Sequence, residues 1–538
     1  MSRQTPKTML IGLDGATFSV LDPLMNAGHM PCLNRLQTQG VRAELASTIP
    51  PITPPAWTTI MTGRSPANHG ILDFFRPESP GSRHLRFVST KQLKCETIWS
   101  YLSRRERRSA CLNFPVMSPP LPISGYSIPG FVTWRHLRHS CHPKDLMDSL
   151  KTIPGFDLKI IAHDFGLEEK VVAGCAPEEA ESWIRYHTYK DGQWVKVLTW
   201  LAERDSINVN ALVLDSVDRL QHVYYRLLDP AVDEGALSES DKRIQRILFK
   251  HFRELDAMIG RLADTAGPDG TVIIVSDHGF GPSRYCFHLN SLLEGLGYLT
   301  WSDRAVSEET GAGDVSMAAV KNHGHLLDWE KTIAFVDTPS SNGIRINVRG
   351  RNSAHGILPE DYDRVVSQLK DHLLALRHPD TGEPVVTSIW TREEAFEGAE
   401  MAPDLTLRLW DNGLVSTVKS DRLIKPRREC TGVHYPMGVF MARGPGIRAG
   451  ARLDALNILD VAPAVLYSQG LPIPEAYEGR VPIEMLEPDS LATHPVTFAS
   501  EGAAAKQKAA AMPGREAPEM DEADMDLIMK RLKGLGYM

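Results

Sequence analysis

Three short apolar segments of this 538-residue chain each end in an acidic residue, and this repeated ending constrains the fold most strongly. The segments are TMLIGLD (8–14), NALVLDSVD (210–218) and TVIIVSD (271–277). A continuous apolar run of this length predicts a strand that is buried on both faces of a parallel sheet. The carboxyl ends of parallel strands lie at one edge of a sheet, where α/β proteins bind their ligands. We therefore expect these acidic residues to gather at one site.

Helices are predicted between these strands. The segment HMPCLNRLQTQG (29–40) ends at a glycine, and DKRIQRILFKHFRELDAMIGRLAD (241–264) carries apolar residues at helical spacing. The order strand, helix, strand predicts an α/β fold in which a central, mostly parallel sheet is flanked by helices.

We divide the chain into a core, an insertion and a tail. The core is predicted over residues 1–124 and 206–486. Residues 125–205 interrupt the strand–helix rhythm and are rich in Trp, His and Pro, so we expect an inserted cap or lid there. Polar, Ala- and Pro-rich composition predicts a flexible linker over 487–520. Acidic residues followed by basic ones predict a short amphipathic helix over 521–538.

Composition and charge argue against a nucleic-acid-binding or membrane protein. The net charge is −8, from 59 basic and 67 acidic residues, which gives no overall attraction to a polyanion. Two basic clusters, 104–108 and 425–428, are typical of solvated faces, the alternative being a site for an anionic partner. No apolar run approaches the roughly 20 residues of a membrane helix, and the first residues do not resemble a secretory signal.

The seven cysteines are scattered and form no CxxC pair. This pattern is typical of thiols in a reducing compartment and not of a disulfide framework or a zinc ribbon. We therefore expect a cytoplasmic protein.

Histidines accompany the acidic strand ends. Asp218 and His222 are four residues apart, on one side of a helical turn, whereas Asp277 and His278 are adjacent. A single Asp at a strand end is usually a turn or cap residue, so the prediction depends on the whole set. Clustered carboxylates repel one another unless a cation neutralises them, and Asp and His are ligands that Zn²⁺ accepts. The candidate metal ligands are Asp14, Asp218, His222, Asp277, His278 and His434.

Thr53 is the candidate nucleophile. It lies between two Pro-Pro pairs in PPITPPAW, and these prolines fix φ and stiffen the loop. We expect a helix to begin at Pro55, and the N-terminus of a helix favours anions. A threonine hydroxyl is a weak nucleophile unless a base or a metal activates it. The alternative role for Thr53 alone is that of a turn or N-cap residue.

The motifs GLDG, TPPAWTTIMTGRSPANHG, DSVDRLQH, SDHGF and GVHYPMG together resemble those of the alkaline phosphatase superfamily. The similarity is closest to the type I phosphodiesterase/nucleotide pyrophosphatase branch and its bacterial relatives, which are described as phosphohydrolases or phosphomutases. It extends from residue 8 to about residue 485. The resemblance implies an alkaline-phosphatase-like sandwich and two divalent metal ions, usually zinc, with Mn²⁺ or Fe as alternatives for such ligands.

The resemblance also implies a role for each candidate residue. One metal ion would be held by Asp14, Asp277 and His278 together with Thr53, and the other by Asp218, His222 and His434. The first ion would activate Thr53, and the second would stabilise the leaving oxygen and later activate a water. The implied reaction is hydrolysis of a small phosphodiester or pyrophosphate-type substrate through a covalent phosphothreonine intermediate, with no nucleic-acid polymer as partner.

Other functions are alternatives at this point. One is a phosphomonoesterase, phosphomutase or phosphonate hydrolase on the same fold. Another, of a different class, is a non-catalytic scaffold that binds a partner or a second copy through the C-terminal helix. The presence of Thr53 and all six ligand candidates argues against the scaffold.

Two positions complicate the assignment. Nucleotide pyrophosphatases carry an Asn three positions after the nucleophile, where this chain has Ala56, and Asn68 is no obvious replacement. The phosphoryl group would then be held by backbone amides near Thr53 or by a cap residue, which leaves diester or monoester preference open. Asp215 is an alternative to Asp218, but the spacing from Asp218 to His222 matches the family pattern.

Overall fold

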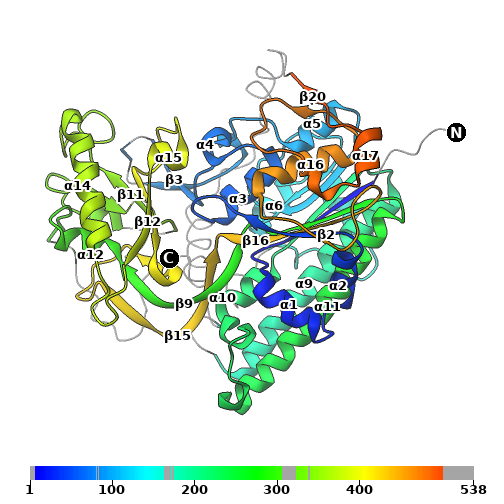
Figure 1. Ribbon diagram of the computed structural model, residues 1–538, viewed down its shortest axis with the longest axis horizontal. Helices are drawn as coiled ribbons and strands as arrows, with labels where there is room; N and C mark the ends of the chain where they lie inside the picture. Colours follow the sequence, from blue (N-terminus) through cyan, green and yellow to red (C-terminus); the bar gives the residue numbers. More distant parts are fainter. Residues whose placement is uncertain are drawn as a thin grey trace.

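The computed structural model describes residues 7–79, 81–82, 84–162, 171, 175–303, 305, 323–336, 338 and 340–500. This part of the chain forms two lobes (Figure 1). The larger lobe contains the central sheet, and the smaller one lies beside it on the left of the view. No helix among the described residues is both long and apolar enough to cross a membrane.

The central sheet has the strand order β17-β2-β16-β8-β1-β7-β5-β6, and β18 also pairs with β2. β16 is antiparallel to β2 and β8, whereas the other paired neighbours are parallel. The prediction of a mostly parallel α/β sheet is therefore confirmed. The strands are β1 (Thr8–Leu13), β2 (Val41–Ala46), β5 (Ser109–Phe114), β6 (Gly125–Pro129), β7 (Val209–Leu214), β8 (Thr271–Val275), β16 (Met437–Arg443), β17 (Ala451–Arg452) and β18 (Leu456–Asn457).

Helices cover both faces of this sheet (Figure 1). Along β1, Met9 and Ile11 pack into one hydrophobic cluster and Leu10 into the other, because side chains alternate across a strand. Burial on both faces explains the continuous apolar runs of the sequence. The first face is covered by α1 (Phe18–Asn26), α2 (Pro31–Thr38), α9 (Pro177–Arg204), α10 (Ser216–Leu228) and α11 (Glu239–Ala266), and the second by α3 (Thr53–Thr62), α5 (Ile98–Arg104) and α16 (Val461–Ser468).

The prediction of a cap over 125–205 is wrong for most of the described residues in that range. β6 pairs with β5 and extends the central sheet. Trp183 and Trp194 of α9 are buried in the same hydrophobic cluster as β1. The shorter helices α6 (Trp134–Ser140) and α7 (Leu146–Leu150) pack there as well. The tryptophans that suggested an insertion therefore belong to the core.

The second lobe lies instead between β9 (Gly279–His288) and β15 (Ile424–Tyr435), within the range predicted as core. These two strands pair antiparallel, with β14 (Leu414–Ser416) alongside β9, and they connect the lobes (Figure 1). The lobe has a hydrophobic core of its own. It contains the sheet β10-β11-β13-β12, with β10 (Ala334–Val336), β11 (Gly343–Ile346), β12 (Val386–Thr391) and β13 (Leu405–Leu409), and the helices α12 (Leu289–Gly295), α14 (Tyr362–Ala375) and α15 (Arg392–Phe396).

The flexible linker predicted from residue 487 is wrong where the chain is described. α17 (Pro488–Thr493) is helical, and β20 (Phe498–Ala499) pairs with β19 (Ile473–Pro474). The rest of the predicted linker, 501–520, and the amphipathic helix predicted over 521–538 lie outside the described residues.

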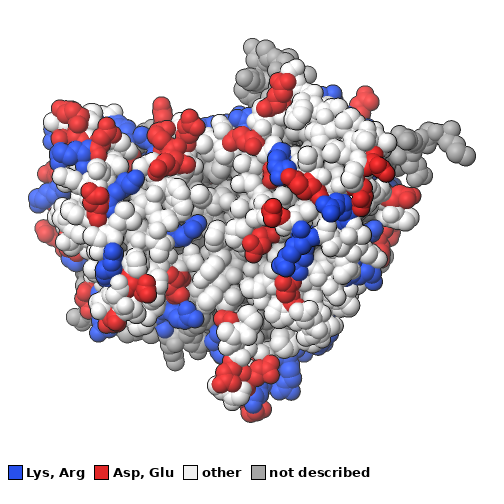
Figure 2. All heavy atoms as spheres, in the orientation of Figure 1, with Lys and Arg blue, Asp and Glu red and all other residues white. Residues whose placement is uncertain are grey.

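Charges of both signs are interspersed over the face shown in Figure 2. In the basic cluster 104–108, Arg104 pairs with Glu96 and Arg108 with Asp205, each at 2.7 Å. Local partners therefore neutralise part of this cluster, as expected for a solvated face.

Candidate active site

The acidic strand ends meet at one edge of the central sheet. β1 lies between β7 and β8, so the residues that follow these three strands are neighbours. Asp14 directly follows β1, Asp277 lies two residues after β8, and Asp218 lies in the first turn of α10, after β7. All three carboxylates are completely buried. The structure thus brings together the acidic residues that the sequence predicted to share an edge.

His278 lies among these carboxylates. Its Nε2 atom is 3.2 Å from Asp277 Oδ2 and 3.7 Å from Asp14 Oδ1. Ligand atoms of Asp14, Asp218 and His278 all lie within 4.8 Å of one another. These residues could therefore hold one metal ion, with Asp218 shared between this group and the next.

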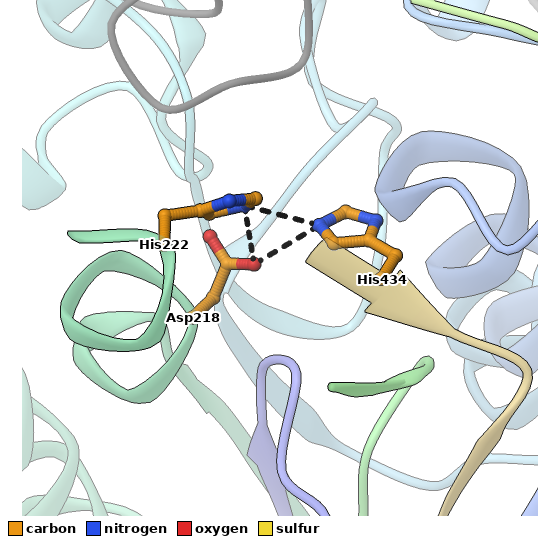
Figure 3. Close-up of side chains that lie close together, drawn as sticks. All are labelled: Asp218, His222 and His434. Carbon is orange, nitrogen blue, oxygen red and sulfur yellow. Dashed lines mark hydrogen bonds and ion pairs between the residues drawn. The ribbon is translucent and has the colours of Figure 1, made fainter. Parts of the chain in front are cut away.

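Asp218, His222 and His434 form a second group (Figure 3). Asp218 Oδ1 is 3.2 Å from the Nε2 atom of each histidine, and the two Nε2 atoms are also 3.2 Å apart. Figure 3 shows Asp218 and His222 projecting from one helix and His434 from β15. The spacing of four residues therefore places Asp218 and His222 on one side of α10, as predicted.

The three histidines share one hydrogen-bonding pattern. Each has its Nδ1 atom against a backbone carbonyl, which can only accept a hydrogen bond, so Nδ1 carries the proton. The Nε2 lone pair is then available for a metal ion. The accepting carbonyls for His222, His434 and His278 belong to Gly432, Pro51 and Gly279, at 3.2, 2.9 and 3.1 Å.

Burial shifts the pKa values of this site in a way that favours a cation. Burial, reinforced by Asp277, raises the pKa of Asp14, and burial raises the pKa of Asp277 to about 8. Burial acts on Asp218 in the same direction, but the two nearby histidines outweigh it and hold the pKa of Asp218 well below its usual value. Burial lowers the pKa of His222 to about 4 and that of His278 well below its usual value, so both imidazoles are neutral.

The donor set fits divalent metal ions. Both oxygens of Asp14 are buried and accept no hydrogen bond from any described residue. A buried carboxylate without a donor or a cation is costly, because it loses the water that would solvate its charge. Buried carboxylates beside neutral imidazoles are the ligands that zinc accepts.

Thr53 begins α3 beside this cluster. Its side chain is fully buried, and its Oγ1 atom is 3.3 Å from His278 Nε2. Trp57, one turn later, packs on Gly12 of β1 so closely that a Cβ atom at Gly12 would overlap its ring. The sheet and the helix therefore fix the position of the hydroxyl together.

Two polar groups close in sequence to the position of the missing Asn already form hydrogen bonds within the protein. The Ala56 N–H donates to the Ile52 carbonyl at 3.0 Å, and prolines 54 and 55 have no N–H. Asn68 donates to Ser65 and Glu478 instead. The amide of Ala56 and the side chain of Asn68 are thus engaged elsewhere.

Asp215, the alternative to Asp218, faces two cations. Lys190 Nζ lies 3.2 and 3.1 Å from its two oxygens, and Arg219 Nε lies 3.5 Å from one of them. All three side chains are fully buried. These contacts neutralise Asp215 and leave Asp218 as the carboxylate that faces the histidines. Sequence reasoning missed Lys190, although a lysine on the apolar face of a long helix was a usable signal.

The site opens into a cavity of about 110 Å³ between the two lobes. His222 and His434 line it together with residues 48–52 of the larger lobe. The second lobe contributes Trp390 and Arg408. Sequence reasoning missed both, because nothing in their local sequence shows that the second lobe faces the acidic strand ends.

A parallel sheet edge that gathers buried carboxylates and imidazoles beside a threonine is the arrangement expected for a member of the alkaline phosphatase superfamily. A family model described as type I phosphodiesterase / nucleotide pyrophosphatase matches residues 8–434. The chain belongs to this family. A comparison with curated protein sequences finds no match.

Solved structures of similar fold include a eukaryotic and a bacterial hydrolase. Murine ectonucleotide pyrophosphatase / phosphodiesterase 5 has a TM-score of 0.50 and 15% identity, over 89% of this chain and 100% of that one. An inactive form of the same protein in complex with AMP has a TM-score of 0.51 and 15% identity, over 90% and 100%. Phosphonoacetate hydrolase from Sinorhizobium meliloti 1021 has a TM-score of 0.50 and 18% identity, over 86% and 95%. At these identities the likeness concerns the fold.

Proposed function

We propose that this protein is a two-metal phosphoryl-transfer hydrolase that cleaves a small phosphodiester or pyrophosphate-type substrate. The observation that carries the proposal is the position of Thr53, whose Oγ1 atom lies 3.3 Å from His278 Nε2 beside two groups of potential metal ligands. Membership in the phosphodiesterase family supports the same reaction class.

Asp14, Asp277 and His278 would hold one divalent ion with Thr53, and Asp218, His222 and His434 would hold the other. When bound, such ions lower the pKa of a hydroxyl and offset negative charge on the phosphoryl group. We propose zinc, because neutral imidazoles and carboxylates suit it, with Mn²⁺ and Fe as the alternatives.

In the proposed reaction Thr53 Oγ1 forms a bond to phosphorus while the bond from phosphorus to the leaving oxygen breaks. Water then hydrolyses the phosphothreonine and regenerates the hydroxyl. The chain contributes position: the prolines around Thr53 and the contact of Trp57 with Gly12 restrain the hydroxyl for in-line attack. The N-terminus of α3 adds a partial positive charge near the phosphoryl group.

Metal content and substrate preference test this function together. The protein is purified without chelators, its metals are measured by mass spectrometry, and its hydrolysis of bis-p-nitrophenyl phosphate and p-nitrophenyl phosphate is compared. We expect two metal ions per chain and faster cleavage of the diester. Faster cleavage of the monoester would favour a phosphomonoesterase, phosphomutase or phosphonate hydrolase. Absence of both metal and turnover after addition of Zn²⁺ or Mn²⁺ would favour a binding scaffold.

We also propose that the protein acts in the cytoplasm. The structure contains no disulfide among the described cysteines, and Cys111 and Cys141 are buried thiols whose pKa is raised to about 12 by burial. Unpaired thiols persist in reducing compartments. Fractionation of cells that produce the protein would test this: its recovery outside the cytoplasm would contradict the proposal.

A further inference from the structure

The cavity beside the candidate metal ligands has a wall that the reaction above does not use. This wall comes from the second lobe and includes Trp390 of β12 and Thr406 and Arg408 of β13. The opposite wall includes His222 and His434. A substrate that reaches the metal ligands therefore also meets the second lobe.

Side chains alternate between the two faces of β13, and this alternation determines which face carries Thr406 and Arg408. Leu405, Leu407 and Leu409 are buried in the hydrophobic core of the second lobe. Since side chains alternate along a strand, Thr406 and Arg408 belong to the other face. Across the antiparallel pair of β12 and β13, the Arg408 guanidinium lies over the Trp390 ring, 5.1 Å from its centre. Stacking of this kind holds a planar guanidinium in place while leaving its N–H groups available at the edge.

The charges around the cavity make Arg408 distinctive. Among the residues that line it, Arg408 is the only Lys, Arg, Asp or Glu. In the described part of the chain no carboxylate forms an ion pair with Arg408. The hydroxyl of Thr406 is buried and has no hydrogen-bond partner among the described residues. A half-buried cation and a neighbouring buried hydroxyl, both without an acceptor, favour an anionic ligand.

No ion pair joins Arg408 to the carboxylates of Asp14, Asp218 or Asp277 among the described residues. Arg408 belongs to β13 of the second lobe, whereas the potential metal ligands lie at the edge of the central sheet, on α10 and on β15. The anion that it binds is then a second charged group of the substrate.

We propose that Arg408, assisted by Thr406, selects substrates that carry an additional anionic group, a carboxylate or a phosphate, beyond the phosphoryl group that reacts. This inference rests on the proposed function and narrows its substrate class to phosphodiesters or pyrophosphate-type compounds with at least one further negative charge. Arg408 is a specificity-determining residue and does not take part in bond cleavage.

Matched pairs of symmetrical substrates test this inference, because symmetry makes the orientation in the site irrelevant. The carboxylate pair is bis(3-carboxy-4-nitrophenyl) phosphate and bis-p-nitrophenyl phosphate. The phosphate pair is diphenyl diphosphate and diphenyl phosphate. We expect Arg408→Gln to lower kcat/KM by about 10- to 100-fold for the member that carries the extra anion, and to change the other by less than about twofold.

The variants include their own controls. Arg408→Lys should restore part of the preference, because it keeps the charge but loses the planar fork and the stacking on Trp390. Arg364 lies on α14 and forms an exposed ion pair with Asp361. The control variant Arg364→Gln should leave kcat/KM unchanged for all four substrates. Loss with the carboxylate pair only, or with the phosphate pair only, identifies the anion. Equal loss for all four substrates, or no change in any of them, would overturn the inference.

A binding measurement separates this inference from the proposed function. Calorimetric titration of bis(3-carboxy-4-nitrophenyl) phosphate into Thr53→Ala and into Thr53→Ala/Arg408→Gln measures recognition without turnover. We expect the dissociation constant to rise by at least about tenfold in the double variant. Lack of turnover by the unmodified protein would overturn the proposed function alone, whereas equal dissociation constants would overturn the role of Arg408 alone.

Discussion

Thr53 depends on its surroundings for reactivity, because a free threonine hydroxyl is a weak nucleophile. Its neighbours are His278, at 3.3 Å, and the carboxylates that follow β1 and β8. Thr53→Ala should retain bound metal, since the six other proposed ligands are unchanged, and should lose turnover by about 10³-fold or more. Thr53→Ser, which keeps a hydroxyl, should retain measurable activity. Metal analysis and steady-state kinetics check both; an alanine variant with full activity would contradict the assignment.

Lys190 offers a second test at the scale of single residues, because its ammonium group neutralises Asp215 in a fully buried contact. Lys190→Met removes one of the two cations that contact Asp215, the other being Arg219. Breaking such a pair should lower the free energy of unfolding by about 3–5 kcal/mol, as measured by urea denaturation. Lys242→Met, which removes a largely exposed pair with Glu239, should cost at most about 0.5 kcal/mol. Similar costs for the two variants would contradict the buried role of Lys190.

Some site residues could be predicted because a nearby sequence pattern marks them. Others could not be predicted because their roles depend on contacts between distant parts of the chain. Asp14, Asp277 and His278 follow apolar strands, and Asp218 and His222 are one helical turn apart, so pattern and motif were enough to predict that these residues lie close together. Arg408 and Lys190 were not predicted, because their roles depend on contacts with elements far away in the chain. Arg408 lies near the site only because the second lobe and the larger lobe line the same cavity. Lys190 contacts Asp215 only because α9 packs on the sheet.

At the scale of elements, the contact between β1 and α3 joins the central sheet to Thr53, the proposed nucleophile. Gly12→Ala would push a Cβ atom into the Trp57 ring. We expect a loss of about 1–3 kcal/mol in the free energy of unfolding from overpacking and a fall in kcat larger than the change in KM, because Thr53 shifts.

Gly192→Ala is the matched control for this contact. A Cβ atom at Gly192, within α9, would meet only Met258 at an ordinary distance of 3.5 Å. This variant should keep full activity and gain up to about 1 kcal/mol from helix propensity. Unchanged kinetics in Gly12→Ala would show that β1 does not restrain Thr53 through Trp57.

The observed helices and strands also show where sequence patterns led to a wrong prediction. Three strands of the central sheet, β1, β7 and β8, were predicted correctly because burial on both faces gives continuous apolar runs. The cap over 125–205 was wrong because richness in Trp, His and Pro was interpreted as a sign of an insertion, although Trp183 and Trp194 of α9 pack in the core. The second lobe was missed because its short strands, such as β13, alternate like any half-buried strand and carry no sign of a separate core.

For the whole molecule, the acidic sheet edge should make stability depend on metal. Burial raises the pKa of Asp14 and Asp277, which shows that their charged forms are unfavourable without a cation. Removal of metal by a chelator should lower Tm by at least about 5 °C, and added Zn²⁺ should restore it, because a ligand that binds only the folded state stabilises that state. Asp14→Asn should show a smaller response to Zn²⁺. If neither chelator nor zinc changed the Tm of a metal-loaded preparation, the predicted dependence of stability on metal would be contradicted.

We propose that catalysis by the whole molecule passes through a covalent bond between Thr53 and phosphorus. The most direct test is to quench the protein in acid during turnover of bis-p-nitrophenyl phosphate and to map its peptides by mass spectrometry. We predict a p-nitrophenyl phosphoryl group on the peptide that contains Thr53, and none in Thr53→Ala. Turnover with an unmodified Thr53 peptide, or with the group attached to another residue, would contradict the account.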